Sequence, residues 1–245
     1  MTTNYDDIAT EYQRAKQQPW RLYLEHYTLF KLCGDLRGKT VLDLACGEGF
    51  YTRFIKRRGA ARVVGVDLSP GMIALARQEE ERAPLGIDYL VHDVKQLALA
   101  QTFDVVVAAY LLNYAQTAAE LVEMGRAIRR HLKPGRWFVT VNNNPRHDVE
   151  YFASTRRYGF IKRAQAPLRE ETPVDYIFFL DDGACTITNY HLSVATHEAA
   201  LHTAGFQQVT WHEPELSPEI TEPTDRQFWA EFLAHPPIIF LACTH

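Results

Sequence analysis

The sequence has little that would tie it to a metal, a membrane or an oxidising compartment. Its four cysteines, at 33, 46, 185 and 243, form no C-x-x-C pair, and no histidine cluster has metal-ligand spacing. The polar start MTTNYDDIATEYQ lacks a signal-peptide core, and no apolar stretch reaches bilayer-spanning length. We therefore expect buried thiols, no metal, no membrane partner and a cytoplasmic protein.

A strong charge of either sign is also missing. The 245 residues include 26 Lys and Arg against 30 Asp and Glu, a formal net charge of −4. Because a broad phosphate-binding face needs a basic surplus, we expect no nucleic-acid partner. The length and the 47% hydrophobic content suit one α/β domain with a modest insertion, as a monomer or weak homodimer.

The stretch VLDLACGEGF, residues 41–50, is the most informative local pattern. A short apolar run with one carboxylate, Asp43, breaks into a loop with Gly47 and Gly49, which predicts a buried parallel strand, a tight turn and a helix. A dinucleotide would place its pyrophosphate on this loop, where Asp43 would repel it, and Thr52 replaces the third glycine of that fingerprint. S-adenosylmethionine carries an ammonium and a sulfonium instead, which a carboxylate attracts.

Four segments then follow one another in an order typical of one enzyme class. DLACGEG, VVGVDLS, YLVHDV and FDVVVAAY begin at residues 43, 63, 89 and 103. As a set they resemble the class I S-adenosylmethionine-dependent methyltransferases. The resemblance implies an α/β fold: a seven-stranded, Rossmann-like, mostly parallel sheet whose last strand is antiparallel. It also implies a helical N-terminal lid and a small antiparallel hairpin cap inserted after strand five.

The same resemblance implies cofactor contacts at the carboxyl ends of the strands. Asp67 would reach the ribose hydroxyls, and Asp93 would accept a hydrogen bond from the adenine amino group. The alternatives are structural, with Asp93 as a helix cap, Met72 as a core side chain and the glycines as a tight connection. The cofactor residues expected in this half are Asp43, Ala45, Gly47, Gly49, Asp67, Leu68, Met72, Asp93, Val94, Ala109 and Tyr110.

The N-terminal segment is expected to lie over the cofactor. EYQRAKQQPWRLYLEHY, residues 11–27, resembles the entry segment of methyltransferases of the glycine N-methyltransferase type, where a tyrosine and a tryptophan contact the methionine end. This resemblance gives those positions to Tyr12 and Trp20, although packing of the aromatic residues onto the sheet is the alternative. The cofactor carboxylate would meet Arg14, Lys16 or Arg21.

Residues 146–193 leave the core pattern and are expected to form a substrate cap. Segments 174–180 and 185–192 predict two strands of a hairpin, and 151–162 predicts a helix. The aromatic side chains here suit a flat substrate, although every other residue of each strand belongs to a hairpin core. The expected division of this single domain is a lid, a cofactor half, a cap and a C-terminal part of the core, at 1–34, 35–145, 146–193 and 194–245.

Methyl transfer from a sulfonium depends mainly on holding the acceptor in line with the methyl group and excluding water. An acidic N–H or a phenol needs modest help in losing its proton, for which tyrosine, histidine and the dipole of an amide are candidates. We expect the catalytic residues Tyr114, Asn142 and His191, with His147 as a further candidate. The expected substrate-binding residues are Tyr5, Tyr114, Asn142, Tyr176 and Tyr190.

Over most of its length the chain looks like the toxoflavin synthase type, through YDDIATEYQRAKQ, GEGFYTRFIKRRGAARVVGVDLS and the terminal strand. Those enzymes N-methylate a pyrimidotriazine (azapteridine) ring, so the resemblance implies two successive N-methylations in toxin biosynthesis. The alternatives are an O- or N-methyltransferase of another small secondary metabolite or amine, and a cofactor-binding protein without catalysis. An NAD-dependent oxidoreductase is disfavoured by Asp43 and Thr52.

Overall fold

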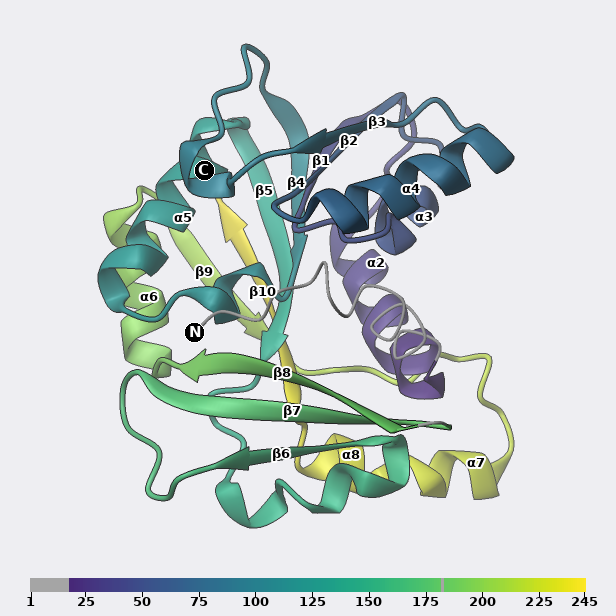
Figure 1. The fold of residues 1–245 in the computed structure, drawn as a ribbon, viewed down its shortest axis with the longest axis vertical. Coiled ribbons are helices and arrows are strands. Elements are labelled where there is room, and N and C mark those ends of the chain that lie inside the picture. Colours follow the sequence, from purple (N-terminus) through teal and green to yellow (C-terminus); the bar gives the residue numbers. More distant parts are fainter. Residues whose placement is uncertain (1–17, 182) are drawn as a thin grey trace.

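Two β-sheets organise the molecule (Figure 1), which is seen here in a computed structural model that describes residues 18–181 and 183–245. The larger sheet has the strand order β3-β2-β1-β4-β5-β10-β9, and the smaller has the order β6-β7-β8. The larger contains β1 (Thr40–Leu44), β2 (Arg62–Asp67), β3 (Asp88–Val91), β4 (Phe103–Ala109), β5 (Leu132–Asn143), β9 (Gln208–His212) and β10 (Ile238–Thr244). The smaller contains β6 (Phe160–Ala164), β7 (Thr172–Leu180) and β8 (Gly183–His191).

The large sheet is parallel from β3 through β5, and β10 runs antiparallel to both β5 and β9. This confirms the predicted α/β fold, including its antiparallel last strand. Strand β4 is almost wholly apolar because helices cover both faces of the sheet. The covering helices are α2 (Tyr27–Cys33), α3 (Phe50–Arg57) and α4 (Pro70–Arg82) on one face, and α5 (Ala118–Arg130) and α6 (Val194–Thr203) on the other.

The smaller sheet lies below the large one in Figure 1 and has one strand more than the expected hairpin. Strands β7 and β8 pair antiparallel from Thr172↔His191 to Leu180↔Gly183, which confirms the predicted hairpin. The helix predicted over 151–162 is wrong in its second half. Short 3-10 turns end at Gly159, whose φ of 92° suits glycine, and β6 follows with alternating inward residues.

The described part of the N-terminal segment is helical, as predicted. A π-helix, η1 (Arg21–His26), continues directly into α2. The predicted site residues Tyr5 and Tyr12, and the basic candidates Arg14 and Lys16, lie outside the described residues. Nowhere in 18–181 or 183–245 does a helix have both the length and the apolar character needed to cross a bilayer.

The remaining C-terminal segment runs back under the cap before it enters β10. It forms two short helices, α7 (Pro223–Phe228) and α8 (Ala230–Ala234). Phe232 of α8 is buried and packs against Trp20, with ring centroids 5.9 Å apart. The cap, the N-terminal helix and the C-terminal segment therefore share one apolar core with one face of the sheet.

Candidate functional site

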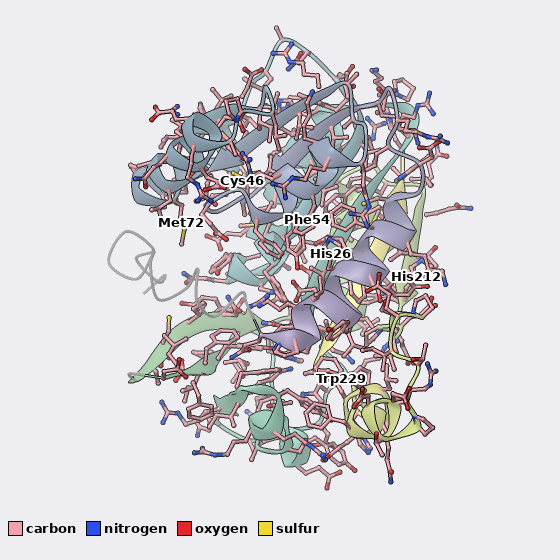
Figure 2. The ribbon with its side chains drawn as sticks, turned by 90° about the vertical axis from the view of Figure 1, so that its right-hand side faces the viewer. His26, Cys46, Phe54, Met72, His212 and Trp229 are labelled. Atoms are coloured by element: carbon pink, nitrogen blue, oxygen red, sulfur yellow. The ribbon has the colours of Figure 1, made fainter. Side chains whose placement is uncertain are left out.

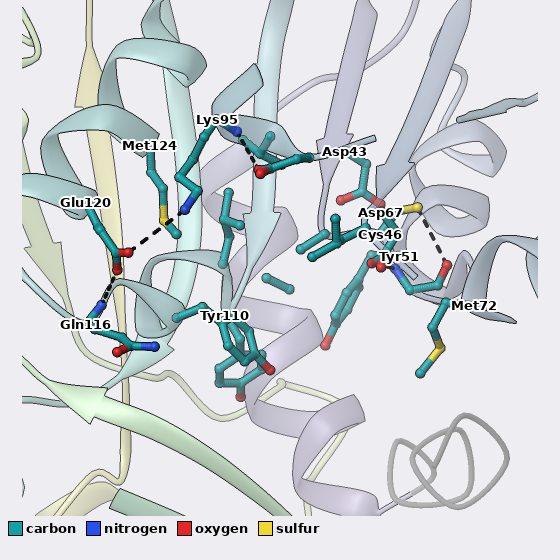
Figure 3. Close-up of a pocket in the computed structure, with 18 of the residues that line it drawn as sticks. Asp43, Cys46, Tyr51, Asp67, Met72, Lys95, Tyr110, Gln116, Glu120 and Met124 are labelled. Atoms are coloured by element: carbon teal, nitrogen blue, oxygen red, sulfur yellow. Dashed lines mark hydrogen bonds and ion pairs between the residues drawn. The ribbon is translucent and has the colours of Figure 1, made fainter. Parts of the chain in front are cut away.

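A cavity of about 230 Å³ lies at the carboxyl ends of β1, β2 and β4 (Figure 3). In an open α/β sheet, this edge is where ligands bind. Most residues predicted to bind the cofactor line this cavity together: Asp43, Ala45, Gly47, Asp67, Leu68, Met72, Asp93, Val94, Ala109 and Tyr110.

The glycine loop after β1 is held in place by two carboxylates. Asp43 is buried and accepts a hydrogen bond from Thr52 Oγ1 at 2.6 Å, so the residue that replaces the third glycine of a dinucleotide fingerprint orients the strand-end carboxylate. Asp67 accepts hydrogen bonds from the backbone N–H of Gly47 at 2.8 Å and of Ser69 at 2.9 Å. The end of β2 therefore fixes the loop that follows β1.

The opposite end of the cavity combines an ion pair with an apolar wall. Asp93 accepts a hydrogen bond from the N–H of Lys95 at 2.9 Å, so it caps the turn after β3 while its side chain also lines the cavity. Lys95 Nζ lies 3.9 Å from Glu120 Oε1 on α5 (Figure 3). Leu111 and Met124 provide apolar surface there.

A buried polar cluster, made by Arg21, Glu25, Tyr51 and Tyr110, closes the inner wall. Glu25 is fully buried and accepts hydrogen bonds from Arg21 Nη1 at 3.1 and 3.2 Å and from both tyrosine hydroxyls. Figure 3 shows Tyr51 and Tyr110 pointing toward the purple N-terminal helix. Burial, and then the charge of Glu25, raise the pKa of Tyr110 well above its usual value.

Sequence reasoning did not identify Glu25, whose only sequence signal is its position four residues after Arg21 on a predicted helix. Arg21 was one of three candidates for the cofactor carboxylate, and it does line the cavity. Its guanidinium also stacks 4.5 Å from the ring centroid of Trp20 and 5.5 Å from that of Phe178. The segment before the sheet therefore contributes to the cavity through its charged residues.

Two residues predicted to contact the cofactor lie off this cavity. Trp20 is buried between Phe160 and Phe232, and its Nε1 donates to Gln18 Oε1 at 2.8 Å, as the packing alternative expected. Gly49 begins α3 at φ 85°, and a Cβ there would lie 2.4 Å from the Tyr89 hydroxyl. Gly49 is therefore required by helix packing at this loop.

A second, narrow cavity of about 20 Å³ separates the large cavity from the smaller sheet, and we refer to it as the slot. Arg21, Tyr110 and Tyr114 line both the slot and the large cavity. Burial raises the pKa of the Tyr114 phenol, and a hydrogen bond to Asn189 of β8 offsets part of that shift. The other slot residues are Trp20, Asn143, Phe160, Tyr176, Phe178, Ile187, Asn189 and Ile238.

The end of β5 presents Asn143, rather than the expected Asn142, to the slot. Asn143 Nδ2 donates to Asn189 Oδ1 at 2.9 Å, which links the two sheets. Asn142 is buried beside Thr140 and lines none of the cavities described here. Because side chains alternate along a strand, a shift of one residue exchanges the two faces.

A third cavity of about 30 Å³, which we call the recess, adjoins the slot through Asn143 and Tyr176. The predicted residues Tyr190 and His191 line the recess rather than the large cavity. Burial lowers the pKa of His191. His147 is also buried, and its pKa falls to about 2. Across 18–181 and 183–245, no group of three or more His, Cys, Asp or Glu side chains is arranged to hold a metal ion.

Comparison with known proteins identifies the domain around this cavity. Residues 41–135 match the family described as a methyltransferase domain. N-demethylindolmycin N-methyltransferase of Streptomyces griseus is 28% identical over 184 residues, which cover 75% of each chain. Ubiquinone biosynthesis O-methyltransferase of Bordetella parapertussis is 36% identical over 117 residues, a match that covers 46% of this chain and about half of the relative's length, 47%.

The fold gives the same result over more of the chain. The crystal structure of an S-adenosylmethionine-dependent methyltransferase from Mesorhizobium loti superposes with a TM-score of 0.63 and 23% identity, covering 89% of this chain and 96% of that one. This likeness shows a shared fold. The matched domain and the related N-methyltransferase agree with this fold, and the chain is an S-adenosylmethionine-dependent methyltransferase.

Proposed function

We propose that this methyltransferase acts on a nitrogen of a small planar heterocycle, and that its substrate is a didemethyl pyrimidotriazine methylated twice in succession. The observation that carries the proposal is the slot next to the large cavity. Its walls are aromatic rings and its polar groups are mainly amides and phenols. Arg21, the one cation among its described lining residues, is paired with Glu25. Such a surface favours a flat, uncharged ring.

The residues of the large cavity fit S-adenosylmethionine. Arg21 is the cation that would receive the cofactor carboxylate, Asp67 is placed for the ribose, and Val94, Leu111 and Met124 offer an apolar wall for the adenine. When bound, this cofactor supplies a methyl group on a sulfonium, and a nucleophile attacks that methyl group in line with its bond to sulfur, so that the sulfur leaves. S-adenosylhomocysteine remains as the product.

The chain's own contribution is orientation. Tyr114 borders both the cofactor cavity and the slot, and its raised pKa keeps the phenol protonated at neutral pH. It therefore orients the acceptor as a hydrogen-bonding group and does not act as a base. Asn143 and Asn189 are hydrogen-bonded to each other and place further polar groups between the two sheets. Holding the acceptor against the methyl group can contribute on the order of 7–11 kcal/mol in favourable cases.

The relatives bear on the choice between nitrogen and oxygen as the methylated atom. The N-methyltransferase of Streptomyces griseus matches over 75% of this chain, whereas the O-methyltransferase match covers 46%. An O- or N-methyltransferase of another small metabolite is the alternative. A cytoplasmic location and a monomeric or weakly dimeric state belong to the same proposal, and sedimentation analysis tests the latter.

An acceptor screen tests the function. Methyl-labelled S-adenosylmethionine is incubated with didemethyl azapteridine, other planar N-heterocycles, phenols and small amines, and the products are read by mass. We expect the azapteridine to gain one and then two methyl groups. Methylation only of phenols would overturn N-methylation, and methylation only of other heterocycles would overturn the pyrimidotriazine.

A further inference from the structure

The recess behind the slot contains a buried amine. Lys162 of β6 is 4% exposed, and its Nζ donates to the backbone oxygen of Pro237 at 2.8 Å. The rings of Phe152 and Tyr176 each lie 5.1 Å from this nitrogen. In the described part of the chain, no carboxylate pairs with it. A lysine in such surroundings is uncommon unless it binds something.

Among the residues that the structure describes, three further polar atoms of the recess are buried and have no hydrogen-bond partner. They are the Tyr176 hydroxyl, Asn113 Nδ2 and Asn143 Oδ1. Leaving such atoms unpaired costs about 1–3 kcal/mol each, so a cluster of them indicates a missing ligand. Three of the groups around the recess donate (Lys162, Tyr176 and Asn113), and one accepts (Asn143). This set of groups complements a ligand whose oxygen accepts hydrogen bonds and whose neighbouring N–H donates one.

We propose that the recess anchors an oxo group of the acceptor, with the adjacent ring N–H directed to Asn143 Oδ1. The inference rests on the proposed function, because the acceptor ring must enter between the side chains of the slot for its edge to reach the recess. At about 20 Å³ the slot admits a ring only when these side chains move apart. Asn143 and Tyr176 line both cavities, so the recess lies directly beside the slot. A volume of about 30 Å³ admits one oxygen-sized group.

The state of Lys162 distinguishes a carbonyl from a carboxylate. Burial lowers the pKa of this amine well below its usual value, so the fold favours its neutral form. A neutral amine donates a hydrogen bond to a carbonyl oxygen, whereas a carboxylate would need a charged partner to offset the loss of its hydration. The substrate class is therefore a planar heterocycle with a cyclic amide edge opposite the methylated nitrogen.

Binding of two matched probes tests this inference without turnover. Quinazolinone has an oxo group beside a ring N–H, and quinazoline is the same ring system without them. Affinities are measured by calorimetry with saturating S-adenosylhomocysteine. We expect wild type to bind quinazolinone roughly 10-fold more tightly than quinazoline. Lys162→Met should lose most of that preference, and Tyr176→Phe should reduce the preference by roughly 2- to 10-fold. Arg163→Met, at an exposed neighbour paired with Asp175, should retain it.

Binding of S-adenosylhomocysteine by each variant verifies that it is folded. Should Lys162→Met fail that control, Tyr176→Phe decides, since it removes one hydroxyl from the recess. Equal binding of the two probes by wild type, or equal losses for both in the variants, would overturn the anchor. Methylation of heterocycles that lack an oxo group, with no preference for quinazolinone, would overturn it while leaving N-methylation intact. A preference for quinazolinone together with no methylation of any heterocycle would overturn N-methylation while leaving the anchor intact.

Discussion

At the end of β2, Asp67 supports the glycine loop that follows β1. Asp67 accepts from the N–H groups of Gly47 and Ser69, and Asp67→Ala leaves both without an acceptor. We expect the affinity for S-adenosylmethionine to fall roughly 10- to 100-fold, because hydrogen bonds to a charged group contribute about 1.5–3 kcal/mol. Calorimetry measures the change. Asp88→Ala, which removes an exposed carboxylate paired with Arg62, is the control and should stay within about 2-fold. An unchanged affinity in Asp67→Ala would contradict the role given to Asp67 in the cofactor site.

Glu25 is the residue on which the inner wall depends. Glu25→Ala removes the carboxylate that pairs with Arg21, whose side chain is 3% exposed, and it removes a hydrogen-bond acceptor that both tyrosine hydroxyls share. We expect the free energy of unfolding to fall by about 3–5 kcal/mol, measured by urea denaturation. Glu79→Ala breaks an exposed pair with Arg82 and should cost less than about 1 kcal/mol. Similar losses in the two variants would refute a structural role for the cluster.

His26 gives the fold a pH dependence. Its ring lies 4.6 Å from that of Phe30 and 4.4 Å from that of Phe54, and burial lowers its pKa from 6.5 to about 4. Figure 2 shows where His26 and Phe54 lie. Because the unfolded chain takes up the proton first, stability is present above pH 6.5 and is lost as the pH falls toward 4. We expect this loss to be about 2 kcal/mol smaller in His26→Phe.

Urea denaturation at pH 7 and pH 4.5 measures that difference. Burial also lowers the pKa of other histidines, such as His131 and His197, so the comparison is between wild type and variant at each pH. His92→Gln changes an exposed imidazole and should follow the wild-type profile. A parallel loss of stability in wild type and His26→Phe would show that the ring does not titrate as described.

At the scale of elements, β5 decides which amide faces the acceptor. We expect Asn143→Ala to raise the acceptor KM roughly 10-fold, because it removes the bond to Asn189 and the Oδ1 that faces the recess. Asn142→Ala should change that KM by less than about 2-fold. Initial-rate kinetics on the acceptor found in the screen measure both. A larger change in KM for Asn142→Ala than for Asn143→Ala would show that Asn142 faces the acceptor, and it would contradict this interpretation of β5.

Strand β5 also shows a feature that the sequence alone does not predict. Alternation within β5 is visible in the sequence, but its phase is set by pairing with β4 and β10, such as Asn143↔Ile238, which no local pattern encodes. The cofactor half was predictable because its apolar runs, glycines and the Ser69 cap are local signals. Strand β6, the position of Trp20 and the partners of Glu25 depend on contacts between distant segments, so they required the structure.

Across the whole molecule, three cavities follow one another from the parallel sheet to the smaller one. The large cavity shares Tyr110 and Tyr114 with the slot, and the slot shares Asn143 and Tyr176 with the recess. The family match, 41–135, includes the lining residues of the first cavity apart from Arg21, whereas the cap strands lie beyond it. The family match therefore covers most of the cavity that we assign to the cofactor, and the cap that we propose to bind the acceptor lies outside it.

This arrangement couples the two ligands. Arg21, Tyr110 and Tyr114 belong to both the cofactor cavity and the slot, so ordering them for one ligand lowers the cost of binding the other. We expect S-adenosylhomocysteine to tighten acceptor binding roughly 5-fold or more, and the acceptor to tighten S-adenosylhomocysteine by the same factor, as linkage requires. Calorimetry in both orders of addition measures the two factors. Tyr114→Phe keeps the ring but loses the bond to Asn189, and it should bring the factor close to one while each ligand still binds alone. Wild-type affinities that are independent of the other ligand would mean that the shared side chains are already fixed.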